Sequence, residues 1–231
     1  MSDTSTPKVR PHFHVLLDRS GSMAAMADDV IGGFNRLIAD QQADGPDACI
    51  TLVQFDSEDP QEVVLDAKRI TKAVPLDRTT FVPRGGTPLL DATARLIARA
   101  ADRQAARAAA GKPAEDVTFI TITDGQENSS REVSRDDVRR LVEAKQAEGW
   151  TFVFMGAGLD AYGDARHMGY DDRSIQAFAP DGVGAQAAFT NLSARTVTYR
   201  RKLRGGETFD RQDYFEGDKP AEADRQRRYH R

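Results

Sequence analysis

The chain has 231 residues, of which 39% are hydrophobic and 29% are charged, a balance that is ordinary for a globular protein and excludes wholesale disorder. This length suits one α/β domain of about 200 residues and leaves little room for a second independent domain. The formal net charge of −4 excludes the strongly basic field that gathers nucleic acid, so we expect no nucleic-acid partner.

The cysteine content and the first residues of the chain bear on its compartment. Cys49 is the single cysteine, so no internal disulfide can form, and its place at the start of an apolar run favours a buried thiol. Residues 1–11 are polar and lack the apolar stretch of a signal peptide. Because no segment reaches the roughly 18 apolar residues of a membrane span, we expect a cytoplasmic protein without a membrane partner.

Apolar runs and turn signals predict strands and helices in alternation. Strands are expected over 12–17, 50–55, 63–70, 117–123, 150–155 and 175–179, and helices over 23–42, 88–110, 134–148, 161–168 and 184–204. Ser134, followed three residues later by Asp137, resembles a capping box at the start of one helix. This alternation predicts an α/β fold with a mainly parallel, Rossmann-like doubly wound sheet and helices on both faces.

The ends of the chain differ in composition from its body. We expect residues 1–11 to form a disordered N-terminal tail and residues 12–204 to form the domain. Beyond Gly205-Gly206 the sequence is polar and ends in a basic run, so residues 205–231 are predicted to be a disordered, partly basic tail.

One carboxylate and two hydroxyls follow the first expected strand at alternate positions. In an extended stretch, residues i, i+2 and i+4 point the same way, so Asp18, Ser20 and Ser22 can converge on one point. Their oxygens suit Mg²⁺ or Mn²⁺. The pattern therefore predicts part of a hard-metal site.

Two later segments extend this prediction, since Mg²⁺ takes about six oxygen ligands. Thr87 precedes a proline that suits the start of a helix, and Asp124 follows a short β-branched strand. Both therefore lie where the carboxyl ends of parallel strands meet and where ligands bind in such sheets.

Three motifs in this order carry a resemblance to a known family. Asp-x-Ser-x-Ser at 18–22, Gly-Gly-Thr-Pro at 85–88 and Thr-Asp-Gly-x-Glu at 123–127 resemble the metal-ion-dependent adhesion site (MIDAS) of von Willebrand factor A (VWA) domains. The similarity runs from about residue 13 to 127 and more weakly to 204. The family's fold has one antiparallel strand at the edge of the sheet, and the turn-rich segment 56–60 fits the corresponding hairpin.

The resemblance implies a set of metal ligands. Ser20, Ser22 and, with ligand bound, Thr87 would hold Mg²⁺ or Mn²⁺, while Asp18 and Asp124 would act largely through water. A carboxylate from a partner protein would complete the shell.

Three further residues are assigned to the rim of this site or to positions behind its ligands: Gly86, Glu127 and Asp91. Glu127 can equally be a surface carboxylate, and Asp91 can equally complement a helix dipole.

We expect a metal-dependent interaction module in the assembly or regulation of a cytoplasmic complex. Compact relatives suggest an AAA+ ATPase of the MoxR type, or kinase and phosphatase partners of a tellurium-resistance-like stress system. The sequence presents no clear catalytic base, so we do not expect an enzyme. Two alternatives stay open: a metal-dependent hydrolase or phosphotransfer enzyme, and a scaffold in which the metal only rigidifies loops.

Overall fold

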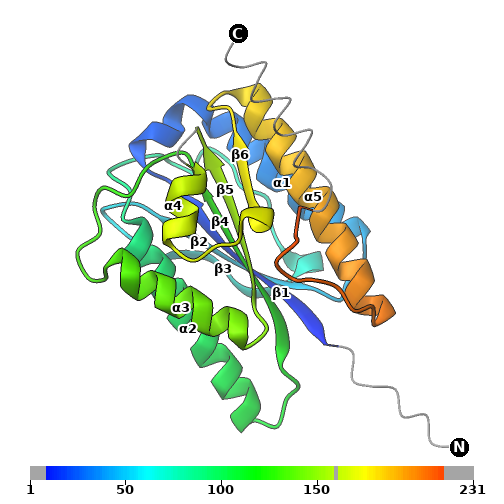
Figure 1. The fold of residues 1–231 in the computed structure, drawn as a ribbon. Helices are drawn as coiled ribbons and strands as arrows, with labels where there is room; N and C mark the ends of the chain where they lie inside the picture. Colours follow the sequence, from blue (N-terminus) through cyan, green and yellow to red (C-terminus); the bar gives the residue numbers. More distant parts are fainter. Residues whose placement is uncertain (1–8, 159–160, 216–231) are drawn as a thin grey trace, which may run out of the picture.

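Strands and helices alternate along the chain in the computed structural model, which describes residues 9–158 and 161–215 (Figure 1). The strands are β1 (Arg10–Asp18), β2 (Cys49–Phe55), β3 (Glu62–Arg69), β4 (Glu115–Thr123), β5 (Thr151–Ala157) and β6 (Ile175–Phe178). The α-helices are α1 (Ala27–Ala43), α2 (Leu89–Ala109), α3 (Arg135–Ala147), α4 (Ala161–His167) and α5 (Gly182–Gly205). Short 3₁₀ helices span Gly21–Met26, Ile70–Lys72 and Asp172–Ser174.

The strands form one six-stranded sheet in the order β3-β2-β1-β4-β5-β6. All neighbours pair in parallel except β2 and β3, which are antiparallel, so the expected fold class and its antiparallel edge strand are confirmed. The chain builds outward from β1 to β3 and then returns to place β4 on the other side of β1. The boundary between β1 and β4 is therefore the topological switch point, beside which doubly wound sheets bind ligands.

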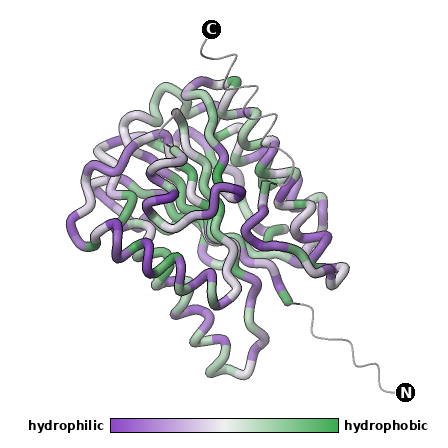
Figure 2. The backbone as a smooth tube through the Cα atoms, viewed as in Figure 1, coloured by the Kyte–Doolittle hydropathy of each residue, from purple (hydrophilic) through white to green (hydrophobic). Residues whose placement is uncertain are grey.

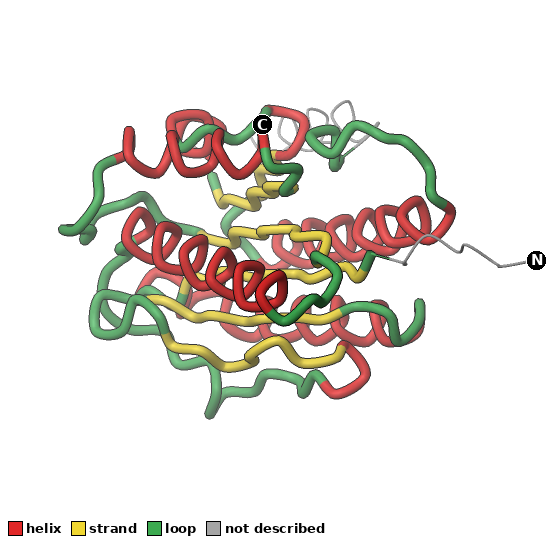
Figure 3. Tube along the Cα trace, turned by 90° about the horizontal axis from the view of Figure 1, so that it is seen from below, coloured by secondary structure: helices red, strands yellow, loops and turns green. Residues whose placement is uncertain are grey.

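Helices cover both faces of the sheet (Figures 1 and 3). Alternation along β1 sends Phe13, Val15 and Leu17 into one apolar cluster with α1 and α5, while Leu16 joins the other cluster with α2, α3 and α4. Figure 2 shows the resulting hydrophobic centre along the strands. Because His12 and His14 alternate with the first set, they lie on the α2 face and are buried there.

The helix expected over 23–42 is broken near its start. Residues Gly21–Met26 form a 3₁₀ helix, and Met26 leaves the helical region with φ −119° and ψ 16° before α1 begins at Ala27. Asp28 and Asp29 then lie in the first turn of α1, where they complement the helix dipole. The expected capping box on α3 is confirmed, because the Ser134 hydroxyl accepts from the Asp137 amide and the Asp137 carboxylate accepts from Ser134.

Part of the segment expected to be a disordered tail is folded. Within residues 207–215, Tyr214 and Phe215 are buried, and the Tyr214 hydroxyl lies 2.8 Å from Oγ1 of Thr196 on α5. The Phe209 ring packs edge-to-face on Tyr199 with centroids 5.0 Å apart. These aromatic side chains bury apolar surface that the local polar composition does not reveal. Residues 1–8 and 216–231 of the two expected tails lie outside the described residues.

No helix within the described residues is both long and apolar enough to cross a membrane.

Candidate metal centre

The sequence-predicted metal residues come from three segments that meet at the carboxyl edge of the sheet. Asp18 is the last residue of β1, and Asp124 directly follows β4, its neighbour in the sheet. Thr87 lies two residues before α2. The site therefore sits at the topological switch point between β1 and β4.

Asp18 lies at the bottom of the site and is fully buried. One carboxylate oxygen accepts a hydrogen bond from the Ser20 amide at 2.7 Å, and the other accepts from the Thr123 hydroxyl at 2.6 Å. Both oxygens are thereby held in fixed directions at the end of β1.

Ser20, Ser22 and Asp124 form a continuous polar chain. The Ser20 and Ser22 hydroxyl oxygens lie 3.0 Å apart, and the Ser22 hydroxyl donates to Asp124 at 2.8 Å. Ser20 is buried, whereas Ser22 is exposed. This row of hydrogen-bonded side chains thus extends from the buried bottom of the site to its solvent-exposed face.

The loop that carries Thr87 is fixed by backbone contacts on both sides. The Thr87 amide donates to Oδ1 of Asn128 at 2.8 Å, and the Asn128 amide donates back to the Thr87 carbonyl at 3.2 Å. Gly86 exchanges two hydrogen bonds with Ser57: its amide donates to the Ser57 hydroxyl at 2.8 Å and its carbonyl accepts from the Ser57 amide at 3.0 Å. A side chain at Gly86 would meet the Ser129 hydroxyl at 2.3 Å, so this position has no room for one.

The donor oxygens converge beside Gly125. A methyl group built on Gly125 would lie 3.1 Å from Oγ1 of Thr87, 3.5 Å from Oγ of Ser22 and 3.8 Å from Oδ2 of Asp18. One point in space is therefore within reach of three oxygens, two from the segment after β1 and one from the loop before α2, while Asp124 reaches this group through its hydrogen bond with Ser22. Such a set of carboxylate and hydroxyl oxygens matches the preference of Mg²⁺ and Mn²⁺.

The electrostatics of the site also fit a cation. Burial raises the pKa of Asp18 to about 6, against hydrogen bonds from Thr123 and Ser20 that favour its charged form. Burial likewise raises the pKa of Asp124. Two partly desolvated carboxylates face the same space, and a divalent cation there would favour the ionised form of both.

An ion pair behind the site joins its loops. The Arg19 side chain is nearly buried and donates to the buried Asp56 carboxylate through Nε at 2.9 Å and Nη2 at 2.7 Å. Arg84, three residues before Thr87, donates to the same carboxylate oxygen at 3.0 Å. Asp56 also accepts from the amides of Glu58 and Asp59. It thereby links the residue after Asp18 to the loop that delivers Thr87.

Glu127 and Asp91 hold backbone in place behind the metal residues. The Glu127 carboxylate accepts from the amides of Ser129, Ser130 and Leu90. The Asp91 carboxylate accepts from the amides of residues 131, 132 and 133. Both carboxylates therefore stabilise the loops through backbone amides and do not lie among the oxygens beside Gly125.

Sequence reasoning did not single out four residues that shape the site: Thr123, Asn128, Ser57 and Asp56. Thr123 stands inside the quoted Thr-Asp-Gly-x-Glu motif, so its place next to Asp124 was a usable signal. Asn128, Ser57 and Asp56 act through contacts with residues 28 to 41 positions away, which no local pattern reveals.

The convergence at Gly125 leads to a direct prediction. Gly125→Ala should abolish tight Mn²⁺ binding without removing any donor atom, because the new methyl group would occupy the space between the three oxygens. Isothermal titration calorimetry on metal-free protein measures the effect. The matched control is Gly32→Ala on α1, where an added methyl meets no atom of the described part of the chain within 4 Å. Wild-type affinity in Gly125→Ala would place the cation elsewhere.

Comparison with known proteins identifies the fold. No family model and no curated protein matches the chain. Among solved structures, the SpRpn10 VWA domain has a TM-score of 0.55 at 13% identity, over 79% of this chain and 95% of that one. The pilus adhesin SpaC from Lactobacillus rhamnosus GG, in its open conformation, has a TM-score of 0.60 at 13% identity, over 83% of this chain and 30% of the adhesin. The manganese-loaded TRAP protein of Plasmodium vivax has a TM-score of 0.52 at 16% identity, over 78% and 72%.

These likenesses define the class of fold. The chain has the Rossmann-like fold of VWA domains, as the resemblance implied. At such low identities, the likeness concerns the fold alone.

Proposed function

We propose that this chain is a protein-interaction module whose contact is a divalent cation at a MIDAS-type site. Ser20, Ser22 and Thr87 would hold Mg²⁺ or Mn²⁺ directly, and Asp18 and Asp124 would act largely through water. The observation that carries the proposal is the approach of Thr87, Ser22 and Asp18 oxygens to one point beside Gly125. An adhesin and a manganese-loaded protein among the structural neighbours support it.

The chemistry of the donors favours an anionic partner. A cation held mainly by neutral hydroxyls keeps much of its charge, so it attracts a carboxylate from outside. Ser22 is exposed and Asp124 is only partly buried, so this face of the site is open to solvent. This access favours partner capture over a cation that only rigidifies loops.

The geometry gives less support to the hydrolase alternative. A phosphoaspartate mechanism would need Asp18 as an accessible nucleophile. Asp18 is fully buried, and both of its oxygens accept hydrogen bonds. We therefore propose a binding role without catalysis, in the assembly or regulation of a complex with an acidic partner such as an AAA+ ATPase or a kinase and phosphatase system.

A pull-down from native extract tests this function. Wild-type protein and Asp124→Ala would each be used as bait in Mg²⁺ and in EDTA. We expect one protein to be retained only by the wild type in Mg²⁺ and to be released by EDTA or free acetate. Equal retention under all conditions would exclude capture through the metal.

A further inference from the structure

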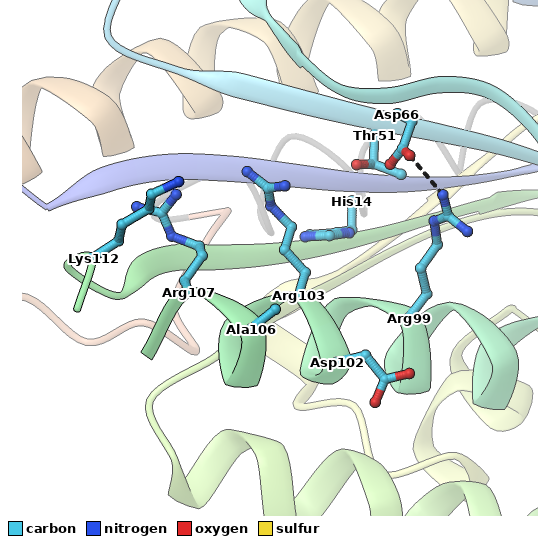
Figure 4. A pocket seen from close by; sticks show the side chains of 9 residues that line it. All are labelled: His14, Thr51, Asp66, Arg99, Asp102, Arg103, Ala106, Arg107 and Lys112. Atoms are coloured by element: carbon cyan, nitrogen blue, oxygen red, sulfur yellow. Dashed lines mark hydrogen bonds and ion pairs between the residues drawn. The ribbon is translucent and has the colours of Figure 1, made fainter. Parts of the chain in front are cut away.

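A second polar site lies on the α2 face of the sheet, away from the candidate metal centre. It is a pocket of about 470 Å³ between the C-terminal half of α2 and strands β1 to β3 (Figure 4). Thr87 of the metal centre lies just before the start of α2 at Leu89, whereas this pocket begins at Arg99, about 15 Å further along the helix at 1.5 Å per residue. None of the predicted metal residues lines this pocket.

Four basic side chains surround the pocket. Arg99, Arg103 and Arg107 follow each other at four-residue spacing on one face of α2, and Lys112 comes from the loop after it. This spacing directs three guanidinium groups to the same side of the helix.

Acidic groups neutralise only part of this charge. Arg99 pairs with Asp66 at 2.8 Å. Glu115 is shared between two arginines, at 2.8 Å from Arg103 and 3.3 Å from Arg107. Asp102 also borders the pocket, but its carboxylate points away from His14 in Figure 4. For Lys112, the described residues provide no ion pair to its ammonium group. The pocket therefore keeps a positive field.

His14 forms the floor of the pocket. Its side chain is 1% exposed and points from β1 toward α2 (Figure 4). Neither ring nitrogen has a hydrogen-bond partner among the described residues, although the ring stacks on His12 with centroids 4.0 Å apart. An unpaired buried polar group destabilises the folded state, so this imidazole is a feature that a bound ligand would explain.

The neighbouring histidine differs in this respect. His12 donates or accepts through Nδ1 with Glu115 at 2.8 Å and through Nε2 with Thr51 at 2.9 Å. Burial lowers the pKa of His14 well below its ordinary value, so its ring is neutral and has one N–H donor and one acceptor nitrogen. The donor can serve a ligand oxygen.

We propose that this pocket binds the phosphate group of a small soluble phosphate ester. Arginine recognises phosphate through paired N–H donors, and the spare guanidinium N–H groups of Arg99 and Arg103 are available for this purpose. The volume is within the range of small-molecule sites and exceeds that needed for inorganic phosphate alone. The neutral His14 N–H would contact the phosphate at the bottom of the pocket.

Titration of metal-free protein in EDTA tests this proposal independently of the metal centre. Inorganic phosphate and glycerol 3-phosphate would be titrated at matched ionic strength, with glycerol and chloride as blanks. Calorimetry gives the affinity, and NMR of the histidine ring protons locates the site, because the chain has only four histidines. We expect both phosphates to bind, glycerol 3-phosphate more tightly, and to shift the His14 ring signals.

Three variants distinguish binding in this pocket from nonspecific attraction of phosphate to the positively charged surface. The double variant Arg99→Gln/Lys112→Gln should weaken binding at least about tenfold, through loss of charge-assisted hydrogen bonds. His14→Phe keeps an aromatic ring but removes both nitrogens, and it should also weaken binding while the protein stays folded. Arg95→Gln is the control: Arg95 precedes Arg99 by one turn of α2, is 40% exposed against 39% for Arg99, and pairs with Glu132 outside the pocket.

Equal phosphate affinity in all four proteins would overturn the proposal, as would binding that leaves the His14 ring unshifted. Vesicles that contain phosphatidic acid should not bind the protein. If the vesicles bind the wild-type protein and not the double variant, the ligand would be a lipid headgroup rather than a soluble ester, and the proposal would be wrong.

Discussion

Asp18→Asn should make the metal-free protein more stable and at the same time remove its stabilisation by Mn²⁺. Asp18 is fully buried near Asp124, and burial raises its pKa from 3.8 to about 6. At pH 7.5 the folded protein therefore holds a charge that burial disfavours. A neutral amide of similar shape avoids this cost, which we expect to be on the order of 1–3 kcal/mol in free energy of unfolding.

The pH dependence gives the sign of this effect. Because burial raises the pKa of Asp18 to about 6, a larger fraction of Asp18 is protonated in the folded metal-free state than in the unfolded chain between about pH 4 and pH 6. The contribution of Asp18 to stability is therefore present below about pH 4 and lost as the pH rises through about 6. Asp18→Asn should flatten this fall in the stability of the EDTA-treated protein.

Mn²⁺ should reverse the order of stability of wild-type protein and Asp18→Asn. At a hundredfold excess of Mn²⁺ over its Kd, wild-type protein should gain about 2.7 kcal/mol, or several degrees in melting temperature. Asp18→Asn should gain almost nothing. Thermal unfolding in EDTA and in Mn²⁺ measures both effects, with Asp102→Asn, an exposed carboxylate on α2, as the control. A variant less stable than wild type in EDTA, or one still stabilised by Mn²⁺, would contradict the proposed role of Asp18.

Asp56→Ala should lower the free energy of unfolding by about 3–5 kcal/mol, because it removes the buried carboxylate of the nearly buried Arg19 guanidinium and leaves it only the partly exposed Glu62. The Asp56 carboxylate is fully buried and accepts from Arg19, Arg84 and two backbone amides, and the hydrogen bonds hold its pKa below the ordinary value although burial alone would raise it. The same substitution frees the loop that carries Thr87. Mn²⁺ affinity should therefore fall in a protein whose metal donors are all intact.

Denaturant unfolding and calorimetry measure these two consequences of Asp56→Ala. Glu62→Ala is the matched control, since Glu62 lies 2.6 Å from the same Arg19 but is 41% exposed, and it should cost about 1 kcal/mol or less. A double-mutant cycle with Arg19→Met should recover part of the loss, because removal of both partners leaves no unpaired charge. Equal effects of Asp56→Ala and Glu62→Ala would show that burial does not set the strength of this pair.

Local patterns predicted the elements of the sheet and the residues at their ends. β-branched and apolar runs marked the strands, and alternation after β1 placed Asp18, Ser20 and Ser22 on one side. Motif order then added Thr87 and Asp124 to the same edge. The structure brings oxygens of Thr87, Ser22 and Asp18 together beside Gly125, with Ser20 and Asp124 connected to them through Ser22.

Local patterns failed where a side chain depends on distant packing. The polar composition of residues 207–215 predicted a tail, yet Tyr214 and Phe215 are buried because aromatic side chains there find apolar surface to cover. Residues 23–26 have helical composition, but they belong to the 3₁₀ helix Gly21–Met26, and Met26 leaves the helical region before α1 begins. In both cases, tertiary contacts outweigh local propensity.

The sequence by itself determined the α/β class and the order of its elements, and it predicted the candidate oxygen donors after β1, before α2 and after β4. These features depend on periodicity and on residue types a few positions apart, which are legible in any one segment. Only the tertiary structure decided that Asp56 connects two loops and that Glu127 and Asp91 hold backbone amides in place. It also placed His14 beside three arginines, with no hydrogen-bond partner among the residues that the structure describes. These roles arise between residues tens of positions apart, and the packing of whole elements against the sheet sets their distances and burial.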